Sequence, residues 1–134
     1  MQPEWPNVDR VIACLERCET GHMPDAERDL AVGDGGRALG RLQIHPITVD
    51  DCNRILGRSV WRAADRADPR KARDMCGVYL RHWGARLPPM LRATPSQFAR
   101  NLARIWNGGP FGWQKPATEP YARKFDAYWK GHVA

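Results

Sequence analysis

Apolar side chains recur at the spacing of an amphipathic helix in four stretches of the chain. The first stretch covers residues 8–19, and its apolar positions are Val8, Val11, Ile12, Leu15 and Cys18. The others cover 69–83, 95–106 and 118–129. Each stretch predicts a helix with one face turned toward a hydrophobic core.

Prolines and their neighbours mark where these helices begin. Asp68-Pro69 and Thr94-Pro95 each place a side-chain hydrogen-bond acceptor directly before a proline in the first helical turn. A further helix is expected after Pro46 and up to Leu56, with Thr48 as a possible cap and Gly57 as its stop signal. We therefore expect a mainly α-helical fold.

A polar loop separates the first helix from the next one. It contains Gly33-Asp34-Gly35-Gly36, a run that needs unusual backbone angles and is typical of a tight turn. A short apolar segment follows over 38–44. We expect a small β-hairpin near residues 30–44, within a single domain over residues 1–134, because this length suits one hydrophobic core.

The net charge of +6 indicates attraction to a polyanion without deciding which one. The arginines are spread along the chain and form no basic run, so nucleic acid is not the expected partner. No run of eighteen apolar residues exists, so stable insertion into a membrane is not expected. The first residues show no basic start before an apolar stretch, so no secretory signal is visible.

The four cysteines are Cys14, Cys18, Cys52 and Cys76. They form no C-x-x-C pair, and no histidine has finger-like spacing from them, so no structural zinc site is expected. Buried thiols that act as small hydrophobic residues are the favoured interpretation. One or two disulfides stay open if the protein is exported. No phosphate-loop, metal-ligand or Ser-His-Asp pattern occurs, so no cofactor is expected.

Two glutamates lie near the end of the first predicted helix, at different angles around its axis. At about 100° per residue, Glu19 lies roughly 45° from the centre of the apolar stripe, whereas Glu16 lies roughly 100° away. Glu19 is therefore expected to face the core side. Burial disfavours the charged form of a carboxyl group, so it favours the proton that a general acid must donate. The alternative is that Glu19 caps the loop or pairs with an arginine.

Four short elements occur in order along the chain: Glu-Thr-Gly at 19–21, Gly-Arg-Leu-Gln-Ile at 40–44, Asn-Gly-Gly-Pro at 107–110 and Ala-Thr-Glu-Pro-Tyr at 117–121. The ordered set resembles the lysozyme-like superfamily, most of all soluble lytic transglycosylases and goose-type lysozymes. Members of that family carry Glu-Ser-Gly, a Gly-Leu-Met-Gln-Ile-like segment, a Tyr-Asn-Ala-Gly-Pro-like turn and a tyrosine in the next helix. The resemblance covers most of the chain and implies a helical, lysozyme-like domain that cleaves the bond between N-acetylmuramic acid (MurNAc) and N-acetylglucosamine (GlcNAc) in peptidoglycan.

The resemblance also implies a role for each matching residue. Glu19 would be the catalytic acid/base, Gln43 would hydrogen-bond to the substrate in its groove, and Asn107 would lie in the turn that shapes the sugar site. Tyr121 would place its hydroxyl near Glu19 or the substrate. Trp113, in the glycine-rich loop after Asn107, is a candidate for stacking on a sugar ring. The alternatives are a solvent-facing amide for Gln43 and an ordinary core residue for Tyr121.

Several positions depart from the family pattern. Thr20 stands where the family has serine, Trp106 where it has tyrosine, and Arg41 brings a charge into an apolar segment. A lysozyme commonly needs a second carboxylate, whereas a lytic transglycosylase can use a hydroxyl of its own substrate. Asp34 is the best second candidate because the glycine turn could aim it at a cleft, and a turn-forming role is its alternative. Hydrolysis and formation of a 1,6-anhydro product therefore both stay open.

The expected partner is the peptidoglycan glycan strand, in the periplasm or the extracellular cell wall. The enzyme would reach it during phage lysis or by non-classical secretion. An antibacterial role would add a cognate inhibitor or immunity protein, and a monomer is expected. A second hypothesis, open because the second carboxylate is not identified, is a lysozyme-like module that binds glycan or has a structural role and cleaves nothing.

Overall fold

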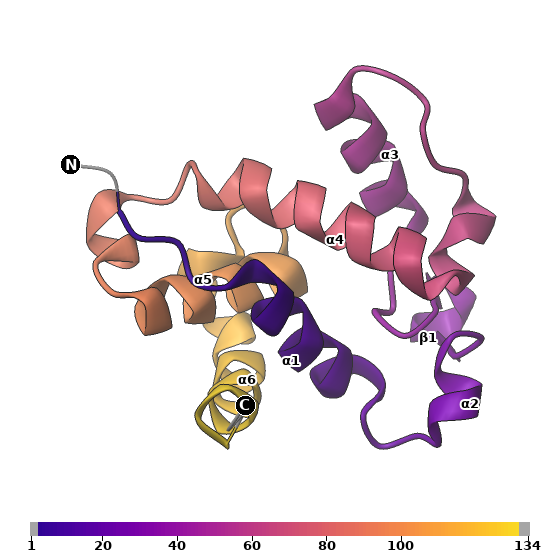
Figure 1. Ribbon diagram of the computed structural model, residues 1–134, viewed down its shortest axis with the longest axis horizontal. Helices are drawn as coiled ribbons and strands as arrows, with labels where there is room; N and C mark the ends of the chain where they lie inside the picture. The colour runs from indigo at the N-terminus through magenta and orange to yellow at the C-terminus, as the bar shows by residue number, and fades with distance from the viewer. Residues whose placement is uncertain (1–2, 132–134) are drawn as a thin grey trace. The chain divides into compact units, whose positions relative to one another are not determined.

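The computed structural model describes residues 3–131 (Figure 1). Its elements, with η for short 3-10 helices, follow in the order α1 (Val8–Thr20), α2 (Asp25–Arg28), β1 (Val32–Gly33), η1 (Asp34–Gly36), β2 (Ala38–Leu39), α3 (Pro46–Leu56), η2 (Ala63–Ala67), α4 (Pro69–Gly84), η3 (Pro89–Arg92), α5 (Pro95–Gly108), η4 (Gly112–Gln114), η5 (Pro116–Thr118) and α6 (Glu119–Gly131). The chain is mainly α-helical with a small two-stranded hairpin, as the sequence predicts. Within this range, no helix is long and apolar enough to cross a membrane.

Side-chain caps confirm the predicted starts of α4 and α5, whereas the expected cap at Thr48 is wrong, since α3 begins at Pro46 without a side-chain cap. Thr94 Oγ1 accepts a hydrogen bond from the backbone N–H of Gln97 at 3.1 Å. Gln97 Oε1 in turn accepts one from the N–H of Ala93 at 3.2 Å, one residue before the cap. Asp68 Oδ1 accepts from two N–H groups in the first turn of α4, at 2.9 and 3.0 Å. These bonds satisfy amide groups that have no partner inside a helix, and so they fix where α4 and α5 begin.

The chain forms two compact units, whose boundaries lie inside α1 and α4. We call the first the helical unit; it comprises the residues up to Cys18 and those from Leu80 onward. We call the second the hairpin unit; it comprises Glu19 to Tyr79. Each is described by itself below.

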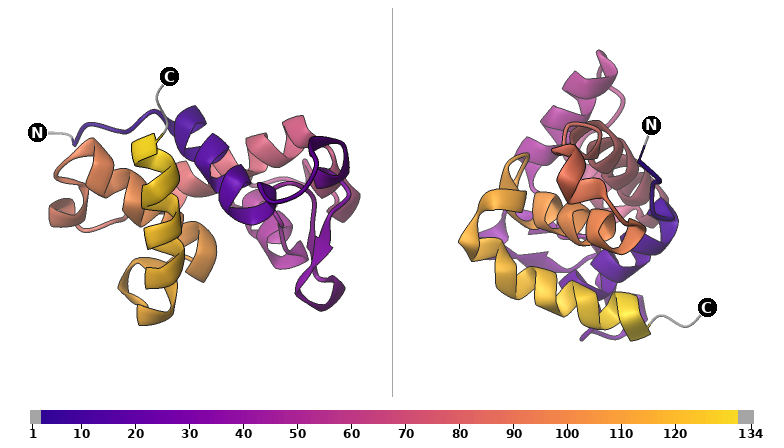
Figure 2. Two further views of the ribbon diagram at one scale, coloured as in Figure 1. Left: turned by 90° about the horizontal axis from the view of Figure 1, so that it is seen from below. Right: turned by 90° about the vertical axis from the view of Figure 1, so that its left-hand side faces the viewer.

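The helical unit is built around α5. Helix α6 and the short helices η3, η4 and η5 all pack against α5, and α5 and α6 lie next to each other in Figure 2. Phe98, Leu102 and Ile105 on α5 and Phe125 on α6 are all 0% exposed. Burying each such side chain contributes roughly 1.5–3 kcal/mol, so α5 supplies the centre of this core.

The hairpin unit takes its name from β1 and β2, which pair antiparallel with Val32 opposite Leu39. An isolated bridge then pairs Leu39 with Ile44, so the chain turns back on itself a second time. Leu42 and Ile44 are 0% and 1% exposed and anchor this segment in the core of the unit. The hairpin predicted near residues 30–44 is therefore confirmed.

All four cysteine side chains are buried thiols. Cys52 Sγ donates a hydrogen bond to the backbone oxygen of Met75 at 3.4 Å, and burial raises the pKa of Cys52 to about 12. Burial also raises the pKa of Cys14 above its ordinary value. A protonated thiol is a poor nucleophile and a poor metal ligand, so Cys14 and Cys52 suit the role of small core residues. Burial of all four cysteines agrees with the favoured interpretation.

Candidate functional site

Glu19 lies in the last turn of α1 and is half-buried, whereas Glu16, one turn earlier, is only 4% exposed. The prediction that Glu19, rather than Glu16, turns toward the core is therefore wrong. Helix α1 is covered beyond its apolar stripe, since Cys14 and Thr20 are 1% exposed as well. The angle between a residue and the apolar stripe therefore does not show which of two glutamates is more buried when the helix is covered on several sides. A substrate can reach the half-buried Glu19, whereas it cannot reach the buried Glu16.

Thr20 fixes the end of α1 immediately after Glu19. Its hydroxyl donates a hydrogen bond to the backbone oxygen of Arg41 at 2.8 Å and accepts one from Arg28 Nε at 3.0 Å. Both bonds lie within the hairpin unit, and Thr20 is 1% exposed. The Glu-Thr-Gly element is thus tied to the Gly-Arg-Leu-Gln-Ile element through a buried hydroxyl. Threonine supplies the same hydroxyl as the serine that the resemblance leads one to expect.

Replacing Thr20 by valine should lower the free energy of unfolding by about 1–3 kcal/mol. Valine keeps the shape but removes the hydroxyl, which leaves the Arg41 carbonyl and Arg28 Nε without this partner. Urea unfolding followed by circular dichroism measures the loss. Thr20→Ser should keep most of the stability because it keeps the hydroxyl, and Thr48→Val on α3 should stay within about 0.5 kcal/mol of the parent. Equal losses for Thr20→Val and Thr20→Ser would show that the methyl group matters and the hydroxyl does not.

Gln43 lies in the turn that follows β2, with a positive φ of 50°. Its side-chain Nε2 donates to the backbone oxygens of Ala31 and Gly40, at 3.0 and 2.9 Å. Gly33 on β1 comes so close that a Cβ there would collide with Gln43 Oε1. Both protons of the amide therefore hold the hairpin together, and Gln43 is half-buried. The predicted hydrogen bond to substrate stays a prediction, and it would use Oε1, which takes no part in these two bonds.

Asp34 pairs with His45, a contact between two residues that are eleven positions apart in the sequence. The distance from Asp34 Oδ2 to His45 Nε2 is 3.1 Å, and Asp34 Oδ1 lies 3.7 Å from an Arg37 nitrogen. Asp34 has a φ of +50° and a side chain that is 55% exposed. It therefore combines the turn-forming role with a carboxylate that solvent and ligands can reach. Its role as a second catalytic carboxylate stays a prediction.

Arg41, the charge that departs from the family pattern, is compensated within the hairpin unit. Its Nε lies 2.8 Å from Asp29 Oδ1, and a terminal nitrogen lies 3.2 Å from Asp25 Oδ1. The Arg41 side chain is 11% exposed, so these pairs are partly shielded from solvent. They hold the segment between α2 and β1 against the turn that contains Gln43.

The other three predicted site residues belong to the helical unit. Asn107 is exposed in the last turn of α5, which ends at Gly108. The expectation that Asn107 lies in the turn is wrong by two residues, since the helix includes both Asn107 and Gly108 and the turn begins at Gly109. Trp113 is half-buried in η4, and Tyr121 is half-buried in the first turn of α6. Their contacts with substrate stay predictions.

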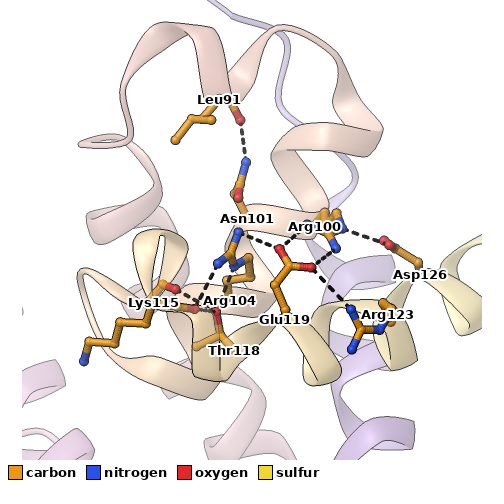
Figure 3. A network of polar contacts seen from close by, with 10 residues as sticks. Leu91, Arg100, Asn101, Arg104, Lys115, Thr118, Glu119, Arg123 and Asp126 are labelled. Atoms are coloured by element: carbon orange, nitrogen blue, oxygen red, sulfur yellow. Dashed lines mark hydrogen bonds and ion pairs between the residues drawn. The ribbon is translucent and has the colours of Figure 1, made fainter.

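A network of charged side chains holds the loop between α5 and α6 (Figure 3). Arg100 reaches both Glu119 oxygens, at 3.3 and 2.8 Å, and its Nε donates to Asp126 at 2.9 Å. Arg104 lies 3.0 Å from Glu119 and donates to Thr118 Oγ1 at 2.8 Å. Glu119 thus lies between two arginines of α5, which fixes the start of α6 on that helix.

The same network reaches the glycine-rich loop. The Thr118 hydroxyl lies 2.8 Å from the backbone oxygen of Gly112, and Lys115 Nζ donates to the backbone oxygen of Gly108 at 2.7 Å. Gly112 packs so closely that a Cβ there would collide with the backbone of Arg104. The Asn-Gly-Gly-Pro element and the element that ends in Tyr121 are therefore joined within the helical unit, and the loop that carries Trp113 is fixed between them.

Hydrogen bonds from Arg100 hold the pKa of Glu119 below its ordinary value, and the charges of Arg104 and Arg123 act in the same direction. A carboxylate whose pKa is lower in the folded than in the unfolded state stabilises the fold above the unfolded pKa, which is about 4.3 for glutamate. That contribution is lost as the pH falls through the unfolded pKa toward the folded one. Acid should therefore weaken the attachment of α6 to α5.

Replacing Glu119 by glutamine should destabilise the protein at about pH 7, and the difference should shrink as the pH falls toward about 3, because protonation removes the same charge from the parent. Urea unfolding at several pH values between these limits gives both curves. Glu27→Gln on the exposed face of α2 is the control and should leave the pH dependence of the parent unchanged. Parallel curves for the parent and Glu119→Gln would contradict the assignment.

Sequence patterns could have indicated this network. Arg100 and Arg104 lie four residues apart on α5, and Glu119 and Asp126 lie seven apart on α6, so each pair shares one helix face. The Asp34–His45 pair carries no such signal, because it depends on the path of the hairpin. Within residues 3–131, no group of three or more His, Cys, Asp or Glu side chains is placed to hold a metal ion.

No protein-family model, curated protein or solved structure matches the chain. The resemblance to the lysozyme-like superfamily therefore rests on the four ordered sequence elements alone. The structure adds how those elements are joined in pairs, one pair in each compact unit.

Proposed function

We propose that this chain is a muramidase-type enzyme that cleaves the MurNAc–GlcNAc bond of peptidoglycan, as a lysozyme or a lytic transglycosylase, with Glu19 as general acid/base. The observation that carries the proposal is the 2.8 Å hydrogen bond from the Thr20 hydroxyl to the backbone oxygen of Arg41. It joins the end of the helix that presents Glu19 to the turn that presents Gln43. A catalytic acid must be held in a fixed position, and this bond from the buried Thr20 side chain supplies such a hold.

The chemistry assigned to Glu19 has two steps. In the first, its protonated carboxyl donates the proton to the glycosidic oxygen while the bond from that oxygen to the sugar carbon breaks. In the second, the resulting carboxylate takes a proton from the group that attacks the same carbon. If that group is water, the product is a reducing MurNAc end. If it is the 6-hydroxyl of the MurNAc itself, the product is a 1,6-anhydro ring.

Ion pairs in the hairpin unit bear on which of the two products forms. Asp25 and Asp29 both pair with Arg41, which gives them a role in holding the segment between α2 and β1. Asp34 is the carboxylate of the glycine turn, and its side chain is 55% exposed, which supports it as the second carboxylate of a hydrolytic reaction. If Asp34 has no catalytic role, Glu19 alone acts in both steps, and the expected product is the 1,6-anhydro ring of a lytic transglycosylase.

A non-catalytic glycan-binding module is the second candidate. The observation that favours it is the pairing of Asp34 with His45 at 3.1 Å and with Arg37 at 3.7 Å, since a paired carboxylate can serve the turn alone. In that case Gln43, Asn107, Trp113 and Tyr121 would contact the glycan strand without its cleavage.

Purified peptidoglycan sacculi distinguish these candidates. Incubation with the chain should release soluble muropeptides, and mass spectrometry should find either reducing ends or 1,6-anhydro ends, which are lighter by one water. Retention of the chain on the sacculi without release at any pH would favour the binding module. Neither retention nor release would contradict both candidates.

A further inference from the structure

A hollow of about 500 Å³ lies in the helical unit, where the N-terminal segment enters α1. Its lining residues are Trp5, Pro6, Asn7, Val8, Asp9 and Arg81. Sites for small ligands typically occupy about 300–1,000 Å³ and combine apolar walls with a few polar groups. None of the residues assigned to glycan cleavage lines this hollow.

Trp5 provides a fixed aromatic wall of the hollow. Its ring lies 4.5 Å from that of Phe98, centroid to centroid, in a tilted arrangement. Its outer edge also lies close over Gly84, where a Cβ would come within 3.2 Å of the indole ring. Trp5 is nevertheless 37% exposed. A tryptophan held on one side and open on the other is a preorganised apolar platform, because little side-chain entropy remains to be lost on binding.

The polar groups of the hollow carry both signs of charge. Asp9 and Arg81 are exposed, and within residues 3–131 neither forms an ion pair or a side-chain hydrogen bond. Asn7 Oδ1 accepts a hydrogen bond from the N–H of Arg10 at 3.0 Å, which fixes the amide at the start of α1. The charges of Asp9 and Arg81 cancel, so Asp9 would repel an anion and Arg81 would repel a cation. A neutral ligand that can both donate and accept hydrogen bonds suits this wall best.

We propose that this hollow is a second saccharide-binding site. The face of a pyranose ring that carries C–H groups suits the Trp5 indole, and its hydroxyls can donate to Asp9 and accept from Arg81. The polymer assigned to it, a peptidoglycan strand, rests on the proposed function, whereas the saccharide class rests on the combination of Trp5, Asp9 and Arg81 in the lining. Contact with a strand at this point would add to the contact at the cleavage site and raise the affinity for the intact wall.

The test uses the full chain with Glu19→Gln, which prevents cleavage, labelled with ¹⁵N and titrated with the tetramer of N-acetylglucosamine. We expect saturable shifts of the Trp5 indole N–H and of the Asp9 and Arg81 amides in the NMR spectrum. Arg81→Ala should weaken this binding about tenfold, the loss of one hydrogen bond from a charged group. The control is Arg58→Ala, which removes an exposed arginine of the hairpin unit and should leave the dissociation constant unchanged.

Trp5→Ala removes the platform but also a contact with Phe98, so its folding is checked by thermal unfolding first. Asp9→Ala and Arg81→Ala change only exposed side chains and keep the test valid if Trp5→Ala does not fold. The proposal is overturned if the tetramer shifts none of the three signals of the folded chain, or if Arg81→Ala binds as tightly as Arg58→Ala. Cleavage of sacculi without binding at Trp5 rejects this site alone, whereas binding at Trp5 without cleavage by the parent chain rejects the proposed reaction alone.

Discussion

Replacing Glu19 by glutamine is expected to lower the rate of muropeptide release by a factor of about 10²–10⁴. Glutamine has nearly the same shape as glutamate but holds no proton that can be transferred to the glycosidic oxygen. Because Glu19 is half-buried at the end of a helix fixed by Thr20, the amide should fit without rearrangement. The variant should therefore still bind sacculi, and its thermal unfolding should resemble that of the parent. Loss of release with retained binding and stability is the combination that a catalytic role predicts.

Two other glutamates, Glu27 on α2 and Glu16 on α1, serve as comparisons. Glu27→Gln, on the exposed face of α2, should leave release unchanged. Glu16→Gln changes the glutamate that is 4% exposed, so it should reduce stability by about 1–3 kcal/mol and leave the reaction of the folded protein intact. Full activity of Glu19→Gln would remove Glu19 from the mechanism. Loss of activity in Glu16→Gln without loss of stability would transfer the acid role to Glu16.

Replacing Gly40 by alanine should cost about 2–5 kcal/mol of folding free energy. Gly40 has a φ of +88°, a conformation that L side chains rarely adopt, and a Cβ there would collide with the backbone oxygen of Arg66. The collision is with backbone, so η2 would have to move. Arg66 also donates to the backbone oxygens of Arg37 and Ile44, at 2.8 and 2.9 Å, and any movement disturbs both bonds. The turn that presents Gln43 should loosen as a result.

Gly35 is the matched control, since its φ of +65° imposes a similar backbone strain but a Cβ there would meet nothing within 4 Å. Gly35→Ala should cost about 1–2 kcal/mol. At about 4 °C for each kcal/mol, the two variants should differ in melting temperature by several degrees. Equal melting temperatures would mean that the contact between Gly40 and Arg66 does not constrain the hairpin unit.

The helices could be predicted from the sequence because their signals are local. Periodic apolar residues and capping residues such as Asp68 and Thr94 act within one or two turns, so the chain order of these signals is sufficient. The hairpin near residues 30–44 follows in the same way, since its glycines permit backbone angles that other residues avoid. The four ordered elements and the choice of Glu19 as candidate acid also come from the sequence alone.

Only the tertiary structure decided which of these elements are joined and which side chains are enclosed. Burial depends on which parts of the protein cover a helix. The helical period therefore predicted that Glu19 faces the core, whereas in the structure Glu16 is the more deeply buried of the two. Hydrogen bonds such as the one from Thr20 to Arg41 link residues twenty-one positions apart, and the pairing of Asp34 with His45 depends on how the hairpin turns. Local patterns determine the elements because their energies are short-range, whereas the contacts between elements exist only once the chain has folded.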